Sequence, residues 1–326
     1  MQNPHTFHVV KEARENFEKK KVIYESVLIT FKGVDGMDVY NCSVPFLYKG
    51  KRHMYGRIEK REEWAGSHVR LFVESGKDEF TVVPGGMTWF IEDPFIAKVN
   101  GEAIFGGTRI RKTRNKVFNY YCDFFRGGIE MNMYFATGPD NMKDIRFVEL
   151  TDGRIGVFSR PKTDEFSCIG FTIVESIDQL TQKLVENAEP LNVLHAGAWG
   201  GVNQAYLLTS GKVGCIAHYS YYTKGPNDRS ISVYLNYSFV LDPETRQSYL
   251  ERIIGTRNCY PACPNKADKL LDCAFTTGII MREDGKCDLY SGLGDTCEGR
   301  ITIDYPFEGY GDYYRSCFRS RTRISK

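Results

Sequence analysis

The acidic pair Glu92-Asp93, which stands directly before Pro94, offers the clearest candidate for a proton donor. Pro94 restricts the backbone and biases Asp93 toward an extended conformation, so this carboxyl is expected at the start of a strand. An Asp-Pro pair usually does no more than begin a turn or an edge strand. Asp93 therefore becomes a catalytic candidate only if the fold brings other reactive groups to it.

Cationic side chains form the second candidate group: Arg57, Lys143, Arg160 and His218. Such groups bind phosphate or carboxylate, although each could equally pair with a nearby acid. An inverting glycosidase that uses water needs two carboxyl groups about 6.5–9.5 Å apart. Phosphate is already an anionic nucleophile, so a phosphorolytic enzyme needs one acid and a cationic cradle. One acid with several cations therefore favours phosphorolysis, or the reverse transfer from a sugar phosphate or a nucleotide sugar.

The elements that position these residues follow from a repeated hairpin pattern. Each copy reads as a strand, a turn that ends in glycine and a second strand, with the glycines at Gly50, Gly101, Gly153, Gly211 and Gly285. Asn-Gly and Asp-Gly pairs favour type I′ hairpin turns. A repeat every ~50–75 residues is typical of a β-propeller with four-stranded blades. We therefore predict an all-β fold, a five-bladed β-propeller with peripheral helices; the alternative is a sandwich of unrelated hairpins.

The repeat also places polar side chains at equivalent positions. Eight or nine residues before each glycine stand Asn41, Asp93, Asp144, Asn203 and Thr277. Seven residues after each glycine stand Arg57, Thr108, Arg160, His218 and Gly292. If these strands are equivalent, their ends meet around the central axis, and polar groups that converge on one cavity mark a site. We expect that ring to contain Asn41, Arg57, Asp93, Lys143, Asp144, Arg160, Asn203 and His218.

The rest of the chain is expected at the periphery of a single domain, residues 1–326. A charged helix over 9–21 lies within an N-terminal helical extension, 1–21, and a second helix is predicted over 176–188 with Ser176 as its cap. The insert 242–272 precedes the last repeat and is expected to overhang the axis. The basic C-terminal tail, 315–326, is interpreted as a solvated end and not as a nucleic-acid arm.

Composition narrows the classes of partner. The formal net charge is only +2, so no polyanion such as nucleic acid is expected. No stretch approaches the roughly 20 apolar residues that span a bilayer, and residues 1–21 lack the apolar core of a secretory signal, so we expect a cytoplasmic protein without membrane contact. Its ten cysteines are then expected to be reduced. Cys259, Cys263 and Cys273 have poor spacing for zinc and no nearby His, so neither a metal nor a cofactor is expected.

Several motifs resemble known carbohydrate-active families. Those that resemble the mannoside phosphorylases of glycoside hydrolase family 130 are Glu92-Asp93-Pro94 with 104–108, then 143–161, 272–278 and 290–296. Those that resemble a sister family, the mannosyltransferase-phosphorylases of glycosyltransferase family 108, are 40–46, 56–64, 198–203 and 238–243. Together they extend from about residue 40 to residue 296.

The resemblance implies a role for each matching residue. Asp93 matches the proton donor, which in family 130 acts through a sugar hydroxyl. The residues that match sugar-binding positions are Asn41, Arg57 and Asp295. Those that match the phosphate or donor cradle are Lys143, Arg160, His218 and Tyr234. Two departures stand out: Asn203 or Gln204 falls near the place of a cradle lysine, and Phe95 stands where family 130 usually has Arg.

Residues and resemblance together predict an inverting β-1,2-mannoside phosphorylase or β-1,2-mannosyltransferase. Its partners would be β-1,2-linked mannose oligosaccharides of a mannogen-like mannan, together with inorganic phosphate, mannose 1-phosphate or GDP-mannose. Two alternatives stay open at this point. One is a hydrolytic glycosidase with Asp144 or Asp295 as its base. The other is a carbohydrate-binding propeller without turnover.

Overall fold

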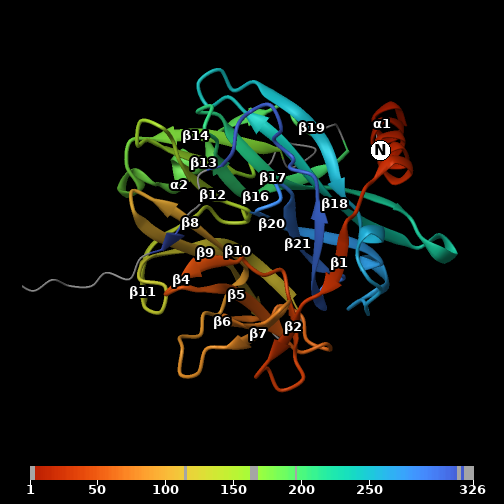
Figure 1. Cartoon of the computed structure of the whole chain (residues 1–326), viewed down its shortest axis with the longest axis horizontal. Coiled ribbons are helices and arrows are strands. Elements are labelled where there is room, and N and C mark those ends of the chain that lie inside the picture. Colours follow the sequence, from red (N-terminus) through yellow and green to blue (C-terminus); the bar gives the residue numbers. More distant parts are fainter. Residues whose placement is uncertain (1–3, 114–115, 162–167, 195–196, 314–316, 319–326) are drawn as a thin grey trace, which may run out of the picture.

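A computed structural model describes residues 4–113, 116–161, 168–194, 197–313 and 317–318 of the chain. These residues form mostly β-strands, which confirms the predicted all-β class. The strands assemble into four hydrogen-bonded sheets, with helix α1 at the outer edge (Figure 1). Within the described ranges, no helix is both long and apolar enough to span a membrane.

Three of the sheets each contain one four-stranded antiparallel meander. The first meander consists of β4 (Phe46–Tyr48), β5 (Lys51–Glu59), β6 (His68–Gly76) and β7 (Glu79–Val82). The short strands β2 (Thr30–Lys32), β3 (Asp38–Tyr40) and β23 (Cys317–Phe318) extend its sheet. The second consists of β8 (Glu92–Val99), β9 (Glu102–Thr113), β10 (Lys116–Gly127) and β11 (Asn132–Thr137). The third consists of β12 (Arg146–Glu149), β13 (Ile155–Ser159), β14 (Ile169–Val174) and β15 (Glu189–Leu191).

The fourth sheet has eight strands and is two such meanders joined side by side. One consists of β16 (Trp199–Leu207), β17 (Val213–Lys224), β18 (Ser230–Leu241) and β19 (Ser248–Gly255). The other consists of β20 (Asp272–Met281), β21 (Cys287–Leu293) and β22 (Cys297–Ile303), completed by β1 (Glu25–Leu28). Only a short parallel pairing of β18 with β20 links them. The described strands therefore contain five four-stranded units, and the last is closed by a strand from the N-terminal end of the chain (Figure 1).

The five predicted hairpin turns lie where the glycines indicated, between the first and second strand of each unit. All five glycines have positive φ, from 74° at Gly50 to 86° at Gly153. Lys49 and Asn100 also have positive φ, so the first two turns have both central residues in the left-handed region, as type I′ requires. In the other three turns only the glycine does, so the type I′ prediction is wrong there. Their longer loops let an ordinary turn precede a single left-handed glycine.

The predicted peripheral helices are confirmed in one case and corrected in the other. Helix α1 (Pro4–Lys20) covers the predicted segment except its last residue, buries Val10, packs the partly buried Phe17 against the sheets, and pairs Arg14 with Asp272 at 2.7 Å. The second segment is not one helix but a 3-10 turn (Ile177–Gln179) followed by α2 (Gln182–Glu186). Ser176 caps the first piece as predicted, and Thr181 caps the second, because a fresh cap interrupts the helical ladder.

The predicted insert 242–272 is only partly an overhanging loop. Its first half forms strand β19, which completes the fourth unit through pairs such as Tyr237 with Ile253. The second half contains the 3-10 turns Arg257–Cys259 and Asp268–Leu270. Between these turns the chain is tied to the end of β21, because Lys266 donates its backbone N–H to the Gly294 carbonyl at 2.8 Å. The basic tail 315–326 lies outside the described residues except for β23.

Candidate active site

In or just before the first strand of each unit, the backbone becomes irregular at one polar residue. Asn41, Asp93 and Asp144 have φ of 46°, 49° and 61°. Asn203 and Thr277 lie at β-bulges, where the pairing register shifts between residues 202 and 204 and between 276 and 278. Asp93 is therefore not extended, as Pro94 led us to predict, but left-handed, a conformation that Asp tolerates better than most residues. The repeat positions identified in the sequence are the positions of this irregularity.

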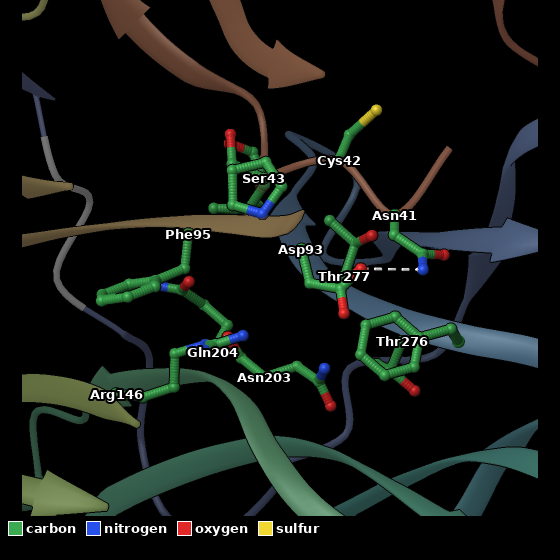
Figure 2. A pocket seen from close by; sticks show the side chains of 13 residues that line it. Asn41, Cys42, Ser43, Asp93, Phe95, Arg146, Asn203, Gln204, Thr276 and Thr277 are labelled. Carbon is green, nitrogen blue, oxygen red and sulfur yellow. Dashed lines mark hydrogen bonds between the residues drawn. The ribbon is translucent and has the colours of Figure 1, made fainter. Parts of the chain in front are cut away.

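These irregularities surround one small central cavity of about 10 Å³, room for roughly one water molecule (Figure 2). Figure 2 shows Asn41, Asp93, Asn203 and Thr277 around it, each from a different unit, with Arg146 from the remaining unit. The structure therefore brings four of the five repeat residues to one point, and in the unit of the fifth, Asp144, the residue at that point is Arg146. Asp144 lies beside this cavity, against Gly201, and takes part in the cationic group described below.

On one side of the central cavity, Asp93 belongs to a buried acidic network. Its carboxylate accepts a hydrogen bond from Asn41 Nδ2 at 3.0 Å and pairs with Arg57 at 2.9 Å. Arg57 also pairs with Glu92 at 3.0 Å, and Asn41 reaches Asp295 at 3.5 Å. Burial raises the pKa values of Glu92 and Asp295, whereas for Arg57 the surrounding carboxylates outweigh burial and raise its pKa well above the ordinary value.

Three residues that the sequence analysis missed complete this network. Glu59 pairs with Arg57 at 3.5 Å, accepts a hydrogen bond from Tyr40, and forms an ion pair with Lys266. Burial alone would raise the pKa of Glu59, but Arg57 and Lys266 together lower it. Glu59 lies inside the motif 56–64 that resembles family 108, and that motif could have identified it as a site residue. Lys266 lies in the loop after β19, and no repeat or motif pointed to it.

On the other side of the central cavity, Asp144 contacts two of the cationic candidates. It pairs with Arg160 at 2.7 Å and stands 3.9 Å from His218 Nε2. Burial would raise the pKa of Asp144, but Arg160, His218 and Lys143 outweigh it and hold that pKa well below the usual range. Burial also lowers the pKa of His218 to about 3, so its imidazole is neutral at pH 7 in the free protein. Asp144 therefore orients the cations, and its own carboxylate is a poor proton acceptor.

The cationic side also presents hydrogen-bond donors that no described residue accepts. Arg160 Nε and Asn203 Nδ2 are both buried and lack a partner in the described part of the chain. Lys143, whose pKa is raised by Asp144 and Asp93 against the effect of burial, makes no ion pair within 4 Å with the described residues. Unsatisfied buried donors are rare in native proteins because each costs about 1–3 kcal/mol. Beside a lysine, they are the arrangement expected where an anion binds.

The last cradle candidate, Tyr234, extends the cationic side along β18. Its ring lies 5.9 Å from the His218 ring and 5.9 Å from the Trp199 ring. Burial raises the pKa of its hydroxyl to about 12. At pH 7 the hydroxyl therefore keeps its proton and can donate a hydrogen bond to an anion. All eight candidate residues are accounted for: Asp93, Asn41, Arg57 and Asp295 on one side, and Lys143, Arg160, His218 and Tyr234 on the other.

Two departures from family 130 also have a structural counterpart. Phe95, in place of the usual Arg, lies under the guanidinium of Arg146 at 4.5 Å from its ring centre. Arg146 in turn donates to the Asn203 backbone carbonyl at 2.8 Å, so a cation reaches the central cavity from β12 instead of β8. Among the described residues, no group of three or more His, Cys, Asp or Glu could hold a metal ion, and Cys259, Cys263 and Cys273 are free.

Comparison with known proteins places this geometry in a family. The family model described as a protein of unknown function, DUF1861, matches residues 15–309. MPT-4, a mannose phosphorylase from Leishmania mexicana solved with a phosphate ion, is 56% identical over 96% of this chain and 98% of its own, with a TM-score of 0.92. MPT-1, a GDP-Man-dependent mannosyltransferase from the same organism, is 52% identical over 94% and 98%, with a TM-score of 0.90.

A more distant structure, from work on the family 130 mannoside phosphorylases and on glycoside hydrolases within that family, aligns with a TM-score of 0.55. It is 15% identical over 85% of this chain and 87% of its own, so this likeness supports the fold alone. No curated protein matches the sequence. The resemblance to mannosyltransferases and phosphorylases, inferred from short motifs, is thus confirmed across nearly the whole chain, and the family 130 structure shares the fold over 85% of it.

Proposed function

We propose that this chain, which belongs to the DUF1861 family, transfers mannose between β-1,2-linked mannose oligosaccharides and phosphate or GDP. Phosphorolysis would release mannose 1-phosphate, and transfer would use GDP-mannose as donor. Identity above one half to both a phosphorylase and a mannosyltransferase supports the enzyme class. The β-1,2 linkage is proposed from the motifs in the sequence.

We further propose that the five strand units are the blades of a five-bladed β-propeller. The closure of the last unit by β1 supports this arrangement, because pairing the two ends of the chain in one blade is a common way to hold such a ring shut. The likeness to a family 130 structure supports it as well. The central cavity would then lie on the propeller axis.

The observation that carries the proposed function is the division of the site into an acid and an anion cradle. Asp93 stands with Asn41, Arg57 and Asp295 on one side, where these groups would hold the reacting mannose. The unpartnered donors of Arg160 and Asn203 stand with Lys143 on the other. Mannose bound between them would present its anomeric carbon to phosphate and its glycosidic oxygen to the acid.

In the proposed reaction, a phosphate oxygen forms a bond to the anomeric carbon while the glycosidic C–O bond breaks. The departing oxygen takes the proton of Asp93, either directly or through a substrate hydroxyl, and the configuration inverts. In the reverse direction, the Asp93 carboxylate accepts the proton of the attacking mannose hydroxyl. Lys143, Arg160, His218 and Tyr234 would stabilise the negative charge of phosphate or diphosphate in both directions.

A hydrolytic mechanism has less support. It needs a carboxylate base to activate water, and Asp144 is engaged by Arg160 with its pKa held low. Asp295 lies 3.5 Å from Asn41, which also binds Asp93, so it stands with the acid on the sugar side. Asp144 therefore lies across from the acid but is a poor base, and Asp295 lies on the same side as the acid, so neither carboxylate meets both requirements of an inverting hydrolase.

The test is to incubate the protein with β-1,2-linked mannose oligosaccharides, with and without phosphate, and separately with GDP-mannose. Products are identified by chromatography and mass spectrometry. We expect mannose 1-phosphate only when phosphate is present, and longer oligosaccharides when GDP-mannose is supplied. Release of free mannose at the same rate without phosphate would identify a hydrolase, and binding without any product would identify a carbohydrate-binding protein.

A further inference from the structure

Two aromatic side chains stand next to the phosphate cradle and have no part in the chemistry described so far. The ring centres of Trp199 and Tyr222 lie 4.5 Å apart, and Trp199 also contacts Tyr234 edge to face at 5.9 Å. Trp199 is half-buried, whereas Tyr222 remains 52% exposed. The pair therefore forms a shelf, Trp199–Tyr222, that begins at a cradle residue and opens to solvent.

The β-sheet register sets the distance between this shelf and the cradle. His218, Ser220 and Tyr222 alternate along β17 and so face the same side of the sheet. Ser220 pairs with Trp199 on one neighbouring strand and with Tyr234 on the other, so these two side chains flank Ser220, and Tyr222 lies two residues further along β17. Tyr222 is four residues beyond His218, about 13 Å along the strand. That distance is comparable to the reach of a diphosphate and a ribose.

We propose that the Trp199–Tyr222 shelf is a nucleobase subsite, on which the purine of a nucleoside diphosphate or of its sugar ester stacks while the diphosphate occupies the cradle. This rests on the proposed function, because it places the phosphate at Lys143, Arg160 and His218. Bases stack on aromatic side chains through their π-faces, and an exposed ring beside a cationic groove is the usual arrangement for such recognition. Free phosphate would reach the same cradle without touching the shelf.

The shelf therefore distinguishes the two donors that this site would accept. Removal of an aromatic ring should lower the affinity for a ligand that carries a base and leave the affinity for inorganic phosphate unchanged. Tyr222→Ala is the principal variant, because it removes the exposed ring and leaves the contact between Trp199 and Tyr234 in place. Trp199→Phe is the second variant, since it keeps an aromatic ring and lowers the risk of disturbing the fold. Tyr134→Ala is the control, because Tyr134 is 58% exposed on β11, in another unit.

The experiment measures Kd for GDP and for pyrophosphate by calorimetry on the full chain, and KM for phosphate during phosphorolysis. Because stacking of a base on an aromatic side chain contributes to the binding free energy, we expect Kd for GDP to rise roughly 5- to 150-fold in Tyr222→Ala. Pyrophosphate affinity and KM for phosphate should stay within about twofold of the wild type. Tyr134→Ala should match the wild type throughout, and circular dichroism reports whether each variant is folded.

Each other outcome overturns the inference. Unchanged GDP affinity in both folded variants would show that the shelf binds no base, as would a wild-type chain that does not bind GDP. An equal loss for GDP and pyrophosphate would mean that the rings only support the cradle. A selective rise in KM for the oligosaccharide would make the shelf an acceptor platform. Failure of the proposed function is a separate result: no turnover of oligosaccharide with any donor, whatever the calorimetry shows.

Discussion

Replacing Asp93 with Asn tests the central chemical assignment. Asn has nearly the same shape and can keep the hydrogen bonds to Asn41 and Arg57, but it has no acidic proton to donate. General acid catalysis contributes about 10²–10⁴-fold to a rate, which corresponds to roughly 3–5 kcal/mol of activation free energy. We therefore expect kcat to fall by that factor, and by a similar factor with phosphate and with GDP-mannose, because both reactions would use one acid.

The same substitution should disturb the fold only mildly. Arg57 would still pair with Glu92 at 3.0 Å and with Glu59 at 3.5 Å, so its charge is not left alone. The loss in free energy of unfolding should therefore stay below the about 3–5 kcal/mol that follows when a buried charge loses its only partner. Denaturant unfolding measures this loss, and calorimetry with the oligosaccharide measures whether sugar binding survives.

A matched control separates the loss of an acid from the loss of a buried ion pair. Asp123 is a buried carboxylate of the same strand unit that pairs with Arg109, outside the central site. Asp123→Asn should cost similar or greater stability and keep most of the turnover. Near wild-type activity in folded Asp93→Asn would refute Asp93 as the acid. An equal loss of activity in both variants would show that the effect arises from the fold.

Three further expectations follow from the geometry. Arg160→Ala should raise KM for phosphate about 10- to 150-fold, which corresponds to the loss of one charge-assisted hydrogen bond, and Arg160→Lys should have a smaller effect. An equal rise in KM for the neutral oligosaccharide would show that Arg160 does not bind the phosphate. His218 has a folded-state pKa of about 3, below its ordinary 6.5, so the unfolded chain takes up the proton first as the pH falls. Between pH 7 and pH 5, the free energy of unfolding of the wild type should therefore fall by about 2 kcal/mol more than that of His218→Asn. Denaturant unfolding measures both, and an equal fall in the two proteins would contradict the neutral, buried state of His218. Gly292→Ala would place a methyl group 1.8 Å from Asn41 Oδ1, so it should abolish activity and lower the unfolding midpoint. In the control Gly76→Ala the added carbon meets nothing closer than 3.6 Å, so this variant should keep both the activity and the midpoint of the wild type.

Local patterns in the sequence predicted a large part of the fold. The hairpin turns depend on the conformational freedom of glycine within a few residues, and Gly50, Gly101, Gly153, Gly211 and Gly285 all adopt the predicted positive φ. The cap at Ser176 also formed where its side chain indicated. The errors were local too: a second cap at Thr181 divided a segment whose apolar spacing suggested one helix.

Equivalent positions in the repeat led to the site because the corresponding segments of the units come close together at one point. Asn41, Asp93, Asn203 and Thr277 converge on the central cavity for this reason. The sequence did not reveal that their strands become irregular there. A left-handed Asp93 before Pro94 contradicts the local preference for extended backbone, and the packing of the surrounding strands supports that conformation.

What the sequence by itself determined is therefore the information that short segments carry: turn positions, strand periodicity, the repeat and the type of each reactive side chain. The tertiary structure alone decided which distant groups meet. Lys266 reaches Glu59 from a loop more than 200 residues away, β1 completes a unit begun by β20, and Trp199 and Tyr222 stand together on neighbouring strands. The same packing buries His218 next to cations and makes it neutral. Contacts and pKa values of this kind depend on burial and on long-range strand pairing, which no local preference encodes.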